Sequence, residues 1–250
     1  PLPVAHKPLS EEARVRQRYV DLIVRPEARQ LLRTRADVLS SVRRTLDAAD
    51  YVEVETPMLQ SVHGGAAARP FDTHINAFGL DFHLRIAIEL HLKRLVVGGV
   101  HRVFEIGRIF RNEGIDSTHS PEFTMLEAYQ AYGDYHTMAE LVRRLVLDAA
   151  EVVGSTVVPD GRGGEIDLAD EWRWLPVHEA VSAALGEEVT PDTSAADLRR
   201  HADRTGVELR PEWGAGDIVL ELFEKLVEHT LIEPTFVCDY PVAVRPLARA

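Results

Sequence analysis

The sequence predicts an α+β fold, in which an antiparallel sheet is flanked by helices and carries an acidic helical insertion. Residues 102–113 and 122–130 alternate apolar and polar side chains on either side of a short polar loop, which is typical of an antiparallel hairpin. Residues 26–49 and 138–153 instead repeat apolar side chains at helical spacing. Residues 160–230 hold 17 acidic and seven basic residues, so the predicted helices of this region form an acidic segment.

The composition is that of a globular protein, with 45% hydrophobic and 27% charged residues in a chain of 250. No apolar run reaches the ~18 residues of a membrane helix, and the segment PLPVAHKPLS lacks a signal-peptide pattern. Cys238 is the one cysteine, which excludes an internal disulfide and favours a reducing, cytoplasmic location. Because the chain begins without Met, we expect it to be part of a longer protein.

The net charge of −12 argues against a surface that coats nucleic acid in general. Residues 1–50, however, hold ten Lys or Arg against seven acidic residues. Any nucleic-acid contact is therefore expected near this basic N-terminal region.

The first predicted helix, over residues 26–49, starts at a proline, which suits the first turn of a helix. Its periodic positions are Leu31, Arg35, Val38, Val42 and Leu46. The sequence YVEVETPML, residues 51–59, predicts a strand stopped by Pro57. The small residues of 64–71 predict a loop.

A second strand is predicted over residues 81–88. A short helix over 89–97 follows, closed by Gly98 and Gly99. The hairpin and the helix over 138–153 come next in the chain.

The segment PDGRGGE, residues 159–165, predicts a linker, followed by two or three helices through about residue 230. TFVCDYPVAV, residues 235–244, predicts a last strand. The predicted division is residues 1–158 for the N-terminal part of the main domain, 159–232 for the helical insertion, and 233–250 for a strand that returns to the main sheet.

Charged residues lie on what should be an inward face of the hairpin. Side chains alternate across a strand, so one face of the second strand carries Phe123, Met125, Glu127 and Tyr129. Arg111 and Glu113 share a face of the preceding strand. A structural ion-pair cluster is one interpretation, but burying several charges without a ligand costs free energy. A ligand with an anion, a cation and a flat ring would complete the face, and ATP together with an amino acid supplies all three.

The run FRNEG…H.PEFTMLE.YQAY.DY within residues 110–135 resembles motif 2 of the class II aminoacyl-tRNA synthetases, specifically of the lysyl-tRNA synthetases. The resemblance extends over essentially the whole chain. VEVETPML resembles motif 1, and further matching segments are ARVRQRYVDLIV (13–24), GGAAARPF (64–71), RIA.EL.LKRL (85–95) and EPTFV.DYP (233–241). Beside the site, the chain departs from the usual family residues at Ile88, His91, Ser120, Ala243 and Arg245.

The resemblance implies a role for each candidate residue. Arg111 would contact both the ATP α-phosphate and the lysine carboxylate, for which its planar fork is suited. The other implied ATP contacts are Glu113, His119 and Phe123. The other implied lysine contacts are Gly65, Glu89, Glu127 and Tyr129. No metal ligand is expected within this chain, since the family's Mg²⁺-binding acids and its motif 3 arginine would lie beyond residue 250.

The implied activity is formation of lysyl-adenylate from lysine and ATP, then transfer of the lysyl group to tRNA(Lys), by a homodimer of which this chain holds a partial catalytic domain. Three alternatives remain open. The domain could belong to an actinobacterial bifunctional lysylphosphatidylglycerol synthetase, where a membrane part would precede it. It could be an elongation-factor lysyl-ligase paralogue, although the junction ARVRQRYVDL argues against this. It could also be a non-catalytic synthetase-like binding protein.

Overall fold

The structure is a computed structural model that describes residues 9–246 and 248. The expectations about the first residues of the chain and about its end at Ala250 fall outside these residues. The chain forms two compact units, Pro1–Gly154 and Ser155–Ala250.

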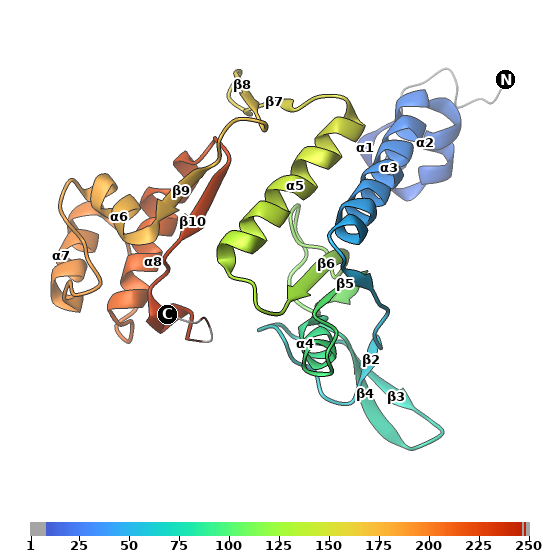
Figure 1. Cartoon of the computed structure of the whole chain (residues 1–250), viewed down its shortest axis with the longest axis horizontal. Helices are drawn as coiled ribbons and strands as arrows, with labels where there is room; N and C mark the ends of the chain where they lie inside the picture. Colours follow the sequence, from blue (N-terminus) through green and yellow to red (C-terminus); the bar gives the residue numbers. More distant parts are fainter. Residues whose placement is uncertain (1–8, 247, 249–250) are drawn as a thin grey trace. The chain divides into compact units, whose positions relative to one another are not determined.

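The first unit is an α+β structure, as predicted (Figure 1). Its elements are α1 (Glu11–Arg16), α2 (Arg18–Val24), α3 (Pro26–Ala48), β1 (Val52–Glu53), β2 (Leu59–Gln60), β3 (Asp72–Ile75), β4 (Leu80–Leu84), α4 (Glu89–Val97), β5 (Arg102–Phe110), β6 (Glu122–Gln130) and α5 (Tyr135–Val153). One sheet has the order β1-β5-β6, with β1 parallel and β6 antiparallel to β5, and the other is antiparallel with the order β2-β4-β3. The single strand predicted over 51–59 is therefore wrong, because its two ends pair in different sheets.

Helices cover both faces of the β5–β6 hairpin. On one face α3 packs against α5, as Figure 1 shows, and the shared core consists of Leu46, Tyr51, Phe104 and Leu141. On the other face α4 contributes to a second core that consists of Ile88, Leu92, Val103 and Ile109. Only the C-terminal part of the stripe predicted on α3 is buried, since Leu31 is 63% exposed.

The hairpin register places the predicted site residues on the α4 side of the sheet. β5 pairs with β6 so that Glu105 lies opposite Glu127 and Ile109 lies opposite Phe123. Residues directly opposite in an antiparallel pair share a face. The backbone NH of Arg111 continues the ladder by donating to Pro121 O at 2.9 Å. Arg111, Phe123 and Glu127 therefore share one face, as predicted.

The second unit contains the helices predicted between the segment 159–165 and residue 230. Its elements are β7 (Val157–Pro159), β8 (Glu165–Asp167), β9 (Arg173–Pro176), α6 (Val177–Leu185), α7 (Ala195–Thr205), α8 (Ala215–Leu226), η2 (Glu228–Thr230), β10 (Thr235–Cys238) and η3 (Val242–Val244). β7 and β8 form an antiparallel hairpin in which Pro159 pairs with Glu165, so the linker predicted over 159–165 is the turn of a hairpin. The strand predicted over 235–244 ends at Cys238.

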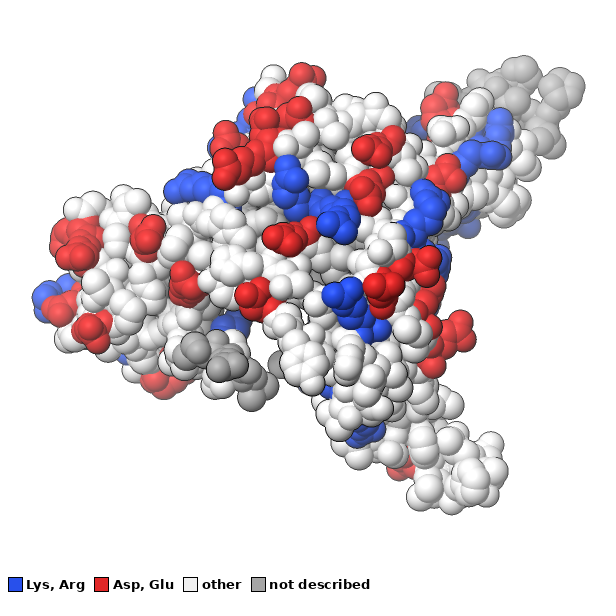
Figure 2. All heavy atoms as spheres, in the orientation of Figure 1, with Lys and Arg blue, Asp and Glu red and all other residues white. Residues whose placement is uncertain are grey.

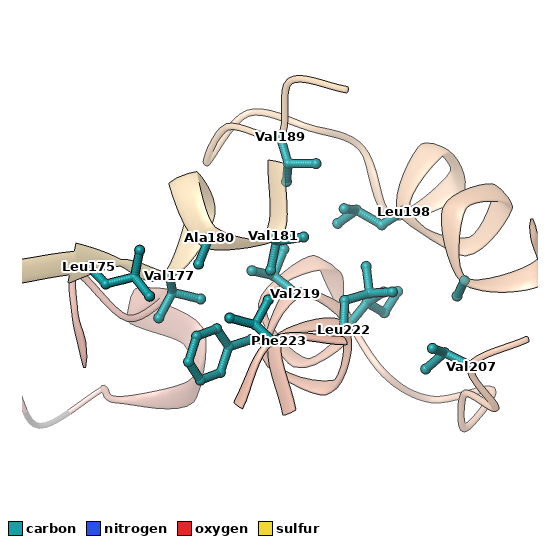
Figure 3. Packing of buried hydrophobic residues seen from close by; sticks show 13 residues of the cluster. Leu175, Val177, Ala180, Val181, Val189, Leu198, Val207, Val219, Leu222 and Phe223 are labelled. Carbon is teal, nitrogen blue, oxygen red and sulfur yellow. The ribbon is translucent and has the colours of Figure 1, made fainter. Parts of the chain in front are cut away.

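A single apolar cluster holds the second unit together. Figure 3 shows Val177, Val181, Val219, Leu222 and Phe223 converging from α6 and α8. β10 lies parallel to β9 in a two-stranded sheet. The proposed return of residues 233–250 to the main sheet, and the division at residues 158 and 232, stay predictions.

Charged side chains are unevenly spread over the surface (Figure 2). The tip of the β3–β4 hairpin shows no charged side chain in that view, and there Phe78 is 76% exposed. Among the described residues, no helix is both long enough and apolar enough to cross a membrane.

Candidate active site

Arg111 follows β5 directly and lies against an aromatic ring. Its guanidinium carbon lies 5.4 Å from the centre of the Phe123 ring, and its Nε donates to Ile86 O at 3.4 Å. Within the described part of the chain, no carboxylate forms an ion pair with Arg111. Glu113, the predicted neighbour, instead accepts from the backbone NH of Arg69 at 3.3 Å. The arrangement leaves a half-buried cation available to an anionic ligand.

The four residues predicted to contact ATP line one pocket. This open pocket has a volume of 590 Å³. Its walls are Arg111, Glu113, Gly114, Asp116, Thr118, His119, Ser120 and Phe123. A cation, an aromatic face and a polar loop around one space suit a nucleotide.

Asp116 organises the loop that carries His119, and the sequence analysis missed it. The Oδ1 atom of Asp116 accepts from the backbone NH of Thr118 at 2.7 Å and from that of His119 at 2.8 Å. The Nδ1 atom of His119 lies 2.9 Å from the same carboxylate. These hydrogen bonds, led by those from Thr118, hold the pKa of Asp116 far below its usual range. An Asp two residues before a Thr is a common turn signal that could have identified it.

Glu127 and Tyr129 form a half-buried acceptor pair at the other end of β6. Glu127 Oε1 accepts from the backbone NH of Ile88 at 3.1 Å, and its Oε2 accepts from the Tyr129 hydroxyl at 2.9 Å. Burial first, then the hydrogen bond to Glu127 and the negative charges of Glu127 and Glu89, raise the pKa of Tyr129. Both partners of Glu127 are neutral, and no cation among residues 9–246 and 248 forms an ion pair with it. A carboxylate in this state is suited to an incoming ammonium group.

Glu89 and Gly65 meet at the start of α4, as predicted. Gly65 has a φ of +87°, and a Cβ on it would lie 3.2 Å from the Glu89 Cβ. Glu89 also pairs with Lys93, whose Nζ lies 2.6 Å from Glu89 Oε1 and 5.9 Å from the centre of the Tyr129 ring. The sequence analysis did not single out Lys93, although the Glu-to-Lys spacing of four residues on a helix is a known pairing signal.

A buried ion pair lies beside the acceptor pair and was also missed. Arg85 Nη1 lies 2.5 Å from Glu105 Oε1, and the two side chains are only 1% and 4% exposed. Glu105 is the residue opposite Glu127 in the register. Glu105 shares a face of β5 with Val103 and Ile109, and a carboxylate on that otherwise apolar face was the signal that could have revealed the pair.

The site therefore has a cationic part at Arg111 and an acidic part at Glu127, joined by one segment. Residues 86–88 contact Arg111 through Ile86 O and Glu127 through the backbone NH of Ile88. Within the described ranges, no group of three or more His, Cys, Asp or Glu side chains is placed to hold a metal ion. The geometry suits a ligand that presents negative charge to Arg111 and an ammonium to Glu127.

Residues 10–250 match the family tRNA synthetases class II (D, K and N), and the chain belongs to this family, as predicted.

The names of the curated relatives refer to lysine or to a lysyl group. The chain is 57% identical over 252 residues to the lysine–tRNA ligase of Mycolicibacterium gilvum and 55% identical over 251 residues to that of Kineococcus radiotolerans, covering 100% of this chain and 50% of each relative. It is 54% identical over 255 residues to the lysylphosphatidylglycerol biosynthesis bifunctional protein LysX of Mycolicibacterium vanbaalenii, covering 100% of this chain and 23% of that protein. The chain thus spans about half the length of the ligases and less than a quarter of LysX.

Proposed function

We propose that this chain is part of a lysyl-tRNA synthetase catalytic domain, which joins lysine to ATP and then transfers the lysyl group to tRNA(Lys). The observation that carries the proposal is the placement of Arg111, which lines a pocket beside Phe123 and is joined to Glu127 by residues 86–88. The identity to lysine–tRNA ligases supports the choice of amino acid.

In the proposed first step, a lysine carboxylate oxygen attacks the α-phosphorus of ATP. The new C–O–P linkage forms as the bond to the β-phosphate oxygen breaks, and pyrophosphate leaves. Arg111 bridges the two anions as they approach, and its fixed charge offsets their repulsion. No protein nucleophile takes part, so orientation and charge neutralisation supply the rate acceleration.

The remaining residues orient the two substrates. Phe123 stacks on the adenine ring, Glu113 accepts from its amino group, and His119 contacts the γ-phosphate. Glu127 and Tyr129 hold the ε-ammonium of lysine. Glu89, with the backbone of Gly65, takes the α-amino group, displacing the Lys93 ammonium that it binds in this structure. Magnesium would reach the site with ATP, held by ligands outside this chain.

Amino-acid-dependent ATP–pyrophosphate exchange tests the proposal, using the protein encoded by the complete reading frame. Exchange should depend on lysine and respond little to arginine or leucine, because Glu127 and Tyr129 form an acceptor for a primary ammonium. Equal exchange with leucine would contradict the lysine assignment.

The second candidate is the same reaction within a bifunctional lysylphosphatidylglycerol protein. The 54% identity to LysX over the whole chain supports it to nearly the same degree as the ligases. Membrane spans encoded upstream in the same reading frame would establish this candidate, and an upstream anticodon-binding domain alone would exclude it.

We also propose a cytoplasmic homodimer. Exposed apolar side chains on α3 and β1 support an interface there, since Leu31, Leu32 and Val52 are more than half exposed. Sedimentation of the complete protein should give a dimer, and a monomer at micromolar concentration would contradict the assembly.

A further inference from the structure

The middle of β5 contains a glycine that a buried guanidinium requires. Gly107 lies opposite Met125, in a strand interior where glycine usually weakens the sheet. A Cβ built on Gly107 would overlap the terminal guanidinium nitrogen of Arg85 and lie 2.9 Å from Glu105 Oε1. The guanidinium of Arg85 therefore occupies the space that a side chain at position 107 would fill.

Nε and Nη1 of Arg85 and both carboxylate oxygens of Glu105 form hydrogen bonds within the protein. Arg85 Nε donates to Arg108 O at 2.8 Å, and its Nη1 donates to Thr56 O at 3.1 Å and to Glu105 at 2.5 Å. The second oxygen of Glu105 accepts from the backbone NH of Thr56 at 3.0 Å and from its hydroxyl at 2.6 Å. Arg85 thereby joins three segments: the chain after β1, the chain after β4, and β5.

The backbone of Arg85 is fixed on both sides. Its NH donates to Met58 O at 2.9 Å, and its carbonyl accepts from the backbone NH of Phe110 at 3.0 Å. The next residues, 86–88, hold Arg111 and Glu127 through backbone atoms, and Glu89 follows at once. The position of Arg85 therefore sets where residues 86–89 begin. Glu89 in this segment is a proposed lysine contact.

Two of the proposed ATP contacts, Glu113 and His119, are supported elsewhere. Glu113 is held by the backbone of Arg69, and His119 by Asp116. Neither support includes Arg85. A disturbance at Arg85 should therefore reach the lysine contacts before the ATP contacts.

We propose that Arg85 is a positioning residue for the lysine site, seated by Gly107 and Glu105, and this inference rests on the proposed function. It acts through residues 86–88, which set the places of Glu127 and Glu89, and it contacts no substrate itself. A buried ion pair contributes little net stability compared with well-packed apolar residues, so stability alone is a weak reason for the pair. An apolar pair in the same place would not supply the hydrogen bonds that fix Arg85 to Arg108 and Thr56.

The test is steady-state exchange with the protein from the complete reading frame, measuring KM for lysine and for ATP separately. Arg85→Lys keeps the charge but loses the fork that reaches Thr56, Glu105 and Arg108 together. The lysine KM should rise about tenfold or more, as expected for losing about 1.4 kcal/mol of binding, while the ATP KM stays within about twofold. Gly107→Ala should shift the lysine KM in the same direction, because it displaces the guanidinium without changing any charge.

Gly133→Ala is the matched control. A Cβ on Gly133 would meet its neighbours at no less than 3.4 Å, so both KM values should stay at the wild-type level. Arg85→Met alone leaves Glu105 buried and unpaired and is expected to impair folding. The double variant Arg85→Met with Glu105→Gln removes both charges, and it should fold while still showing the raised lysine KM.

The outcomes separate this inference from the proposed function. If the wild type shows lysine-dependent exchange but the Arg85 and Gly107 variants keep a normal lysine KM, the positioning role is overturned and the proposed function stands. A fall in kcat with both KM values unchanged would indicate lost folded protein and would also overturn it. If the wild type shows no lysine-dependent exchange, the proposed function fails and the inference fails with it.

Discussion

The two ends of the β5–β6 hairpin present their candidate site residues in different states. At the end of β6 away from the loop, called the α4 end, Glu127 and Tyr129 are half-buried. They are hydrogen-bonded to each other, and Glu127 also accepts from a backbone NH. At the loop end, Glu113 and His119 are exposed: Glu113 accepts from the backbone NH of Arg69, which does not line the pocket, and His119 is held by Asp116, which does. Glu127 and Tyr129, two of the proposed lysine contacts, are thus held within the packed sheet, whereas the proposed ATP contact His119 is held by a local turn.

The difference indicates which contacts are formed before a ligand arrives. Side chains held by packing and neighbouring hydrogen bonds lose little freedom on binding, which favours selectivity for a small ligand. An exposed loop can adapt to a large, flexible triphosphate at the cost of ordering it. We therefore expect substitutions at the α4 end to act on lysine and substitutions at the loop end to act on ATP.

Arg111→Lys should give the largest effect, because Arg111 is the residue proposed to contact both ATP and lysine. The charge remains, but the fork that would bridge the α-phosphate and the lysine carboxylate is lost. The loss is worth roughly 3–4 kcal/mol by analogy with removal of one transition-state donor, so the adenylation rate should fall about a hundredfold or more.

Thermal melting alongside the exchange assay distinguishes this role from a structural one. The melting temperature should change little, since within residues 9–246 and 248 the side chain of Arg111 makes one long hydrogen bond, to Ile86 O. A normal rate would end the catalytic role. A large drop in melting temperature would assign Arg111 to the structure of the sheet instead.

Glu127→Gln should show the separation between the two ends. The amide keeps the size of the side chain but removes the counter-ion for the lysine ammonium, and a hydrogen bond to a charged group contributes about 1.5–3 kcal/mol. The lysine KM should therefore rise roughly 10- to 100-fold with little change in the ATP KM. Glu113→Gln is the control at the loop end, and it should raise the ATP KM instead. If Glu127→Gln and Glu113→Gln changed both KM values equally, the two ends of the hairpin would not act on different substrates.

Much of this hairpin could be predicted from sequence, because its signals are local. The alternation over 122–130 predicted the bounds of β6, and Glu89 and Gly98 marked the ends of α4. The shared face of Arg111 and Glu127 followed from the two-residue period of a strand.

The features that were missed depend on contacts between distant residues. Arg85 and Glu105 are 20 positions apart, and no periodicity within one segment brings them together. The strand predicted over 51–59 was wrong for the same reason, since its two halves pair with different partners, β5 and β4. The sequence does not distinguish Gly107 from other strand residues, because the guanidinium beside it comes from Arg85 in a distant segment.

The smallest expected effect concerns Asp116 at the loop end. Its carboxylate accepts from Thr118 and His119, which is why its folded pKa lies below the ordinary value. A depressed folded pKa means that this contribution to loop order is present above about pH 4, the unfolded value, and is lost as the pH falls toward the folded value. Asp116→Asn removes the charge at every pH, so at neutral pH it should raise the ATP KM by a few fold and leave the lysine KM unchanged. The variant's melting temperature should match the wild type, because the Asp116 side chain is exposed.

Asp160→Asn is the matched control for this prediction. Asp160 lies in the β7–β8 turn of the second unit, accepts from the backbone NH groups of Arg162 and Gly164, and also has a pKa below its usual range. Asp160 accepts turn hydrogen bonds of the same kind as Asp116 but does not line the pocket. Asp160→Asn should therefore leave both KM values unchanged. If Asp116→Asn and Asp160→Asn behave alike, the Asp116 turn is only a local structural feature, and His119 does not depend on it for its proposed contact with the γ-phosphate.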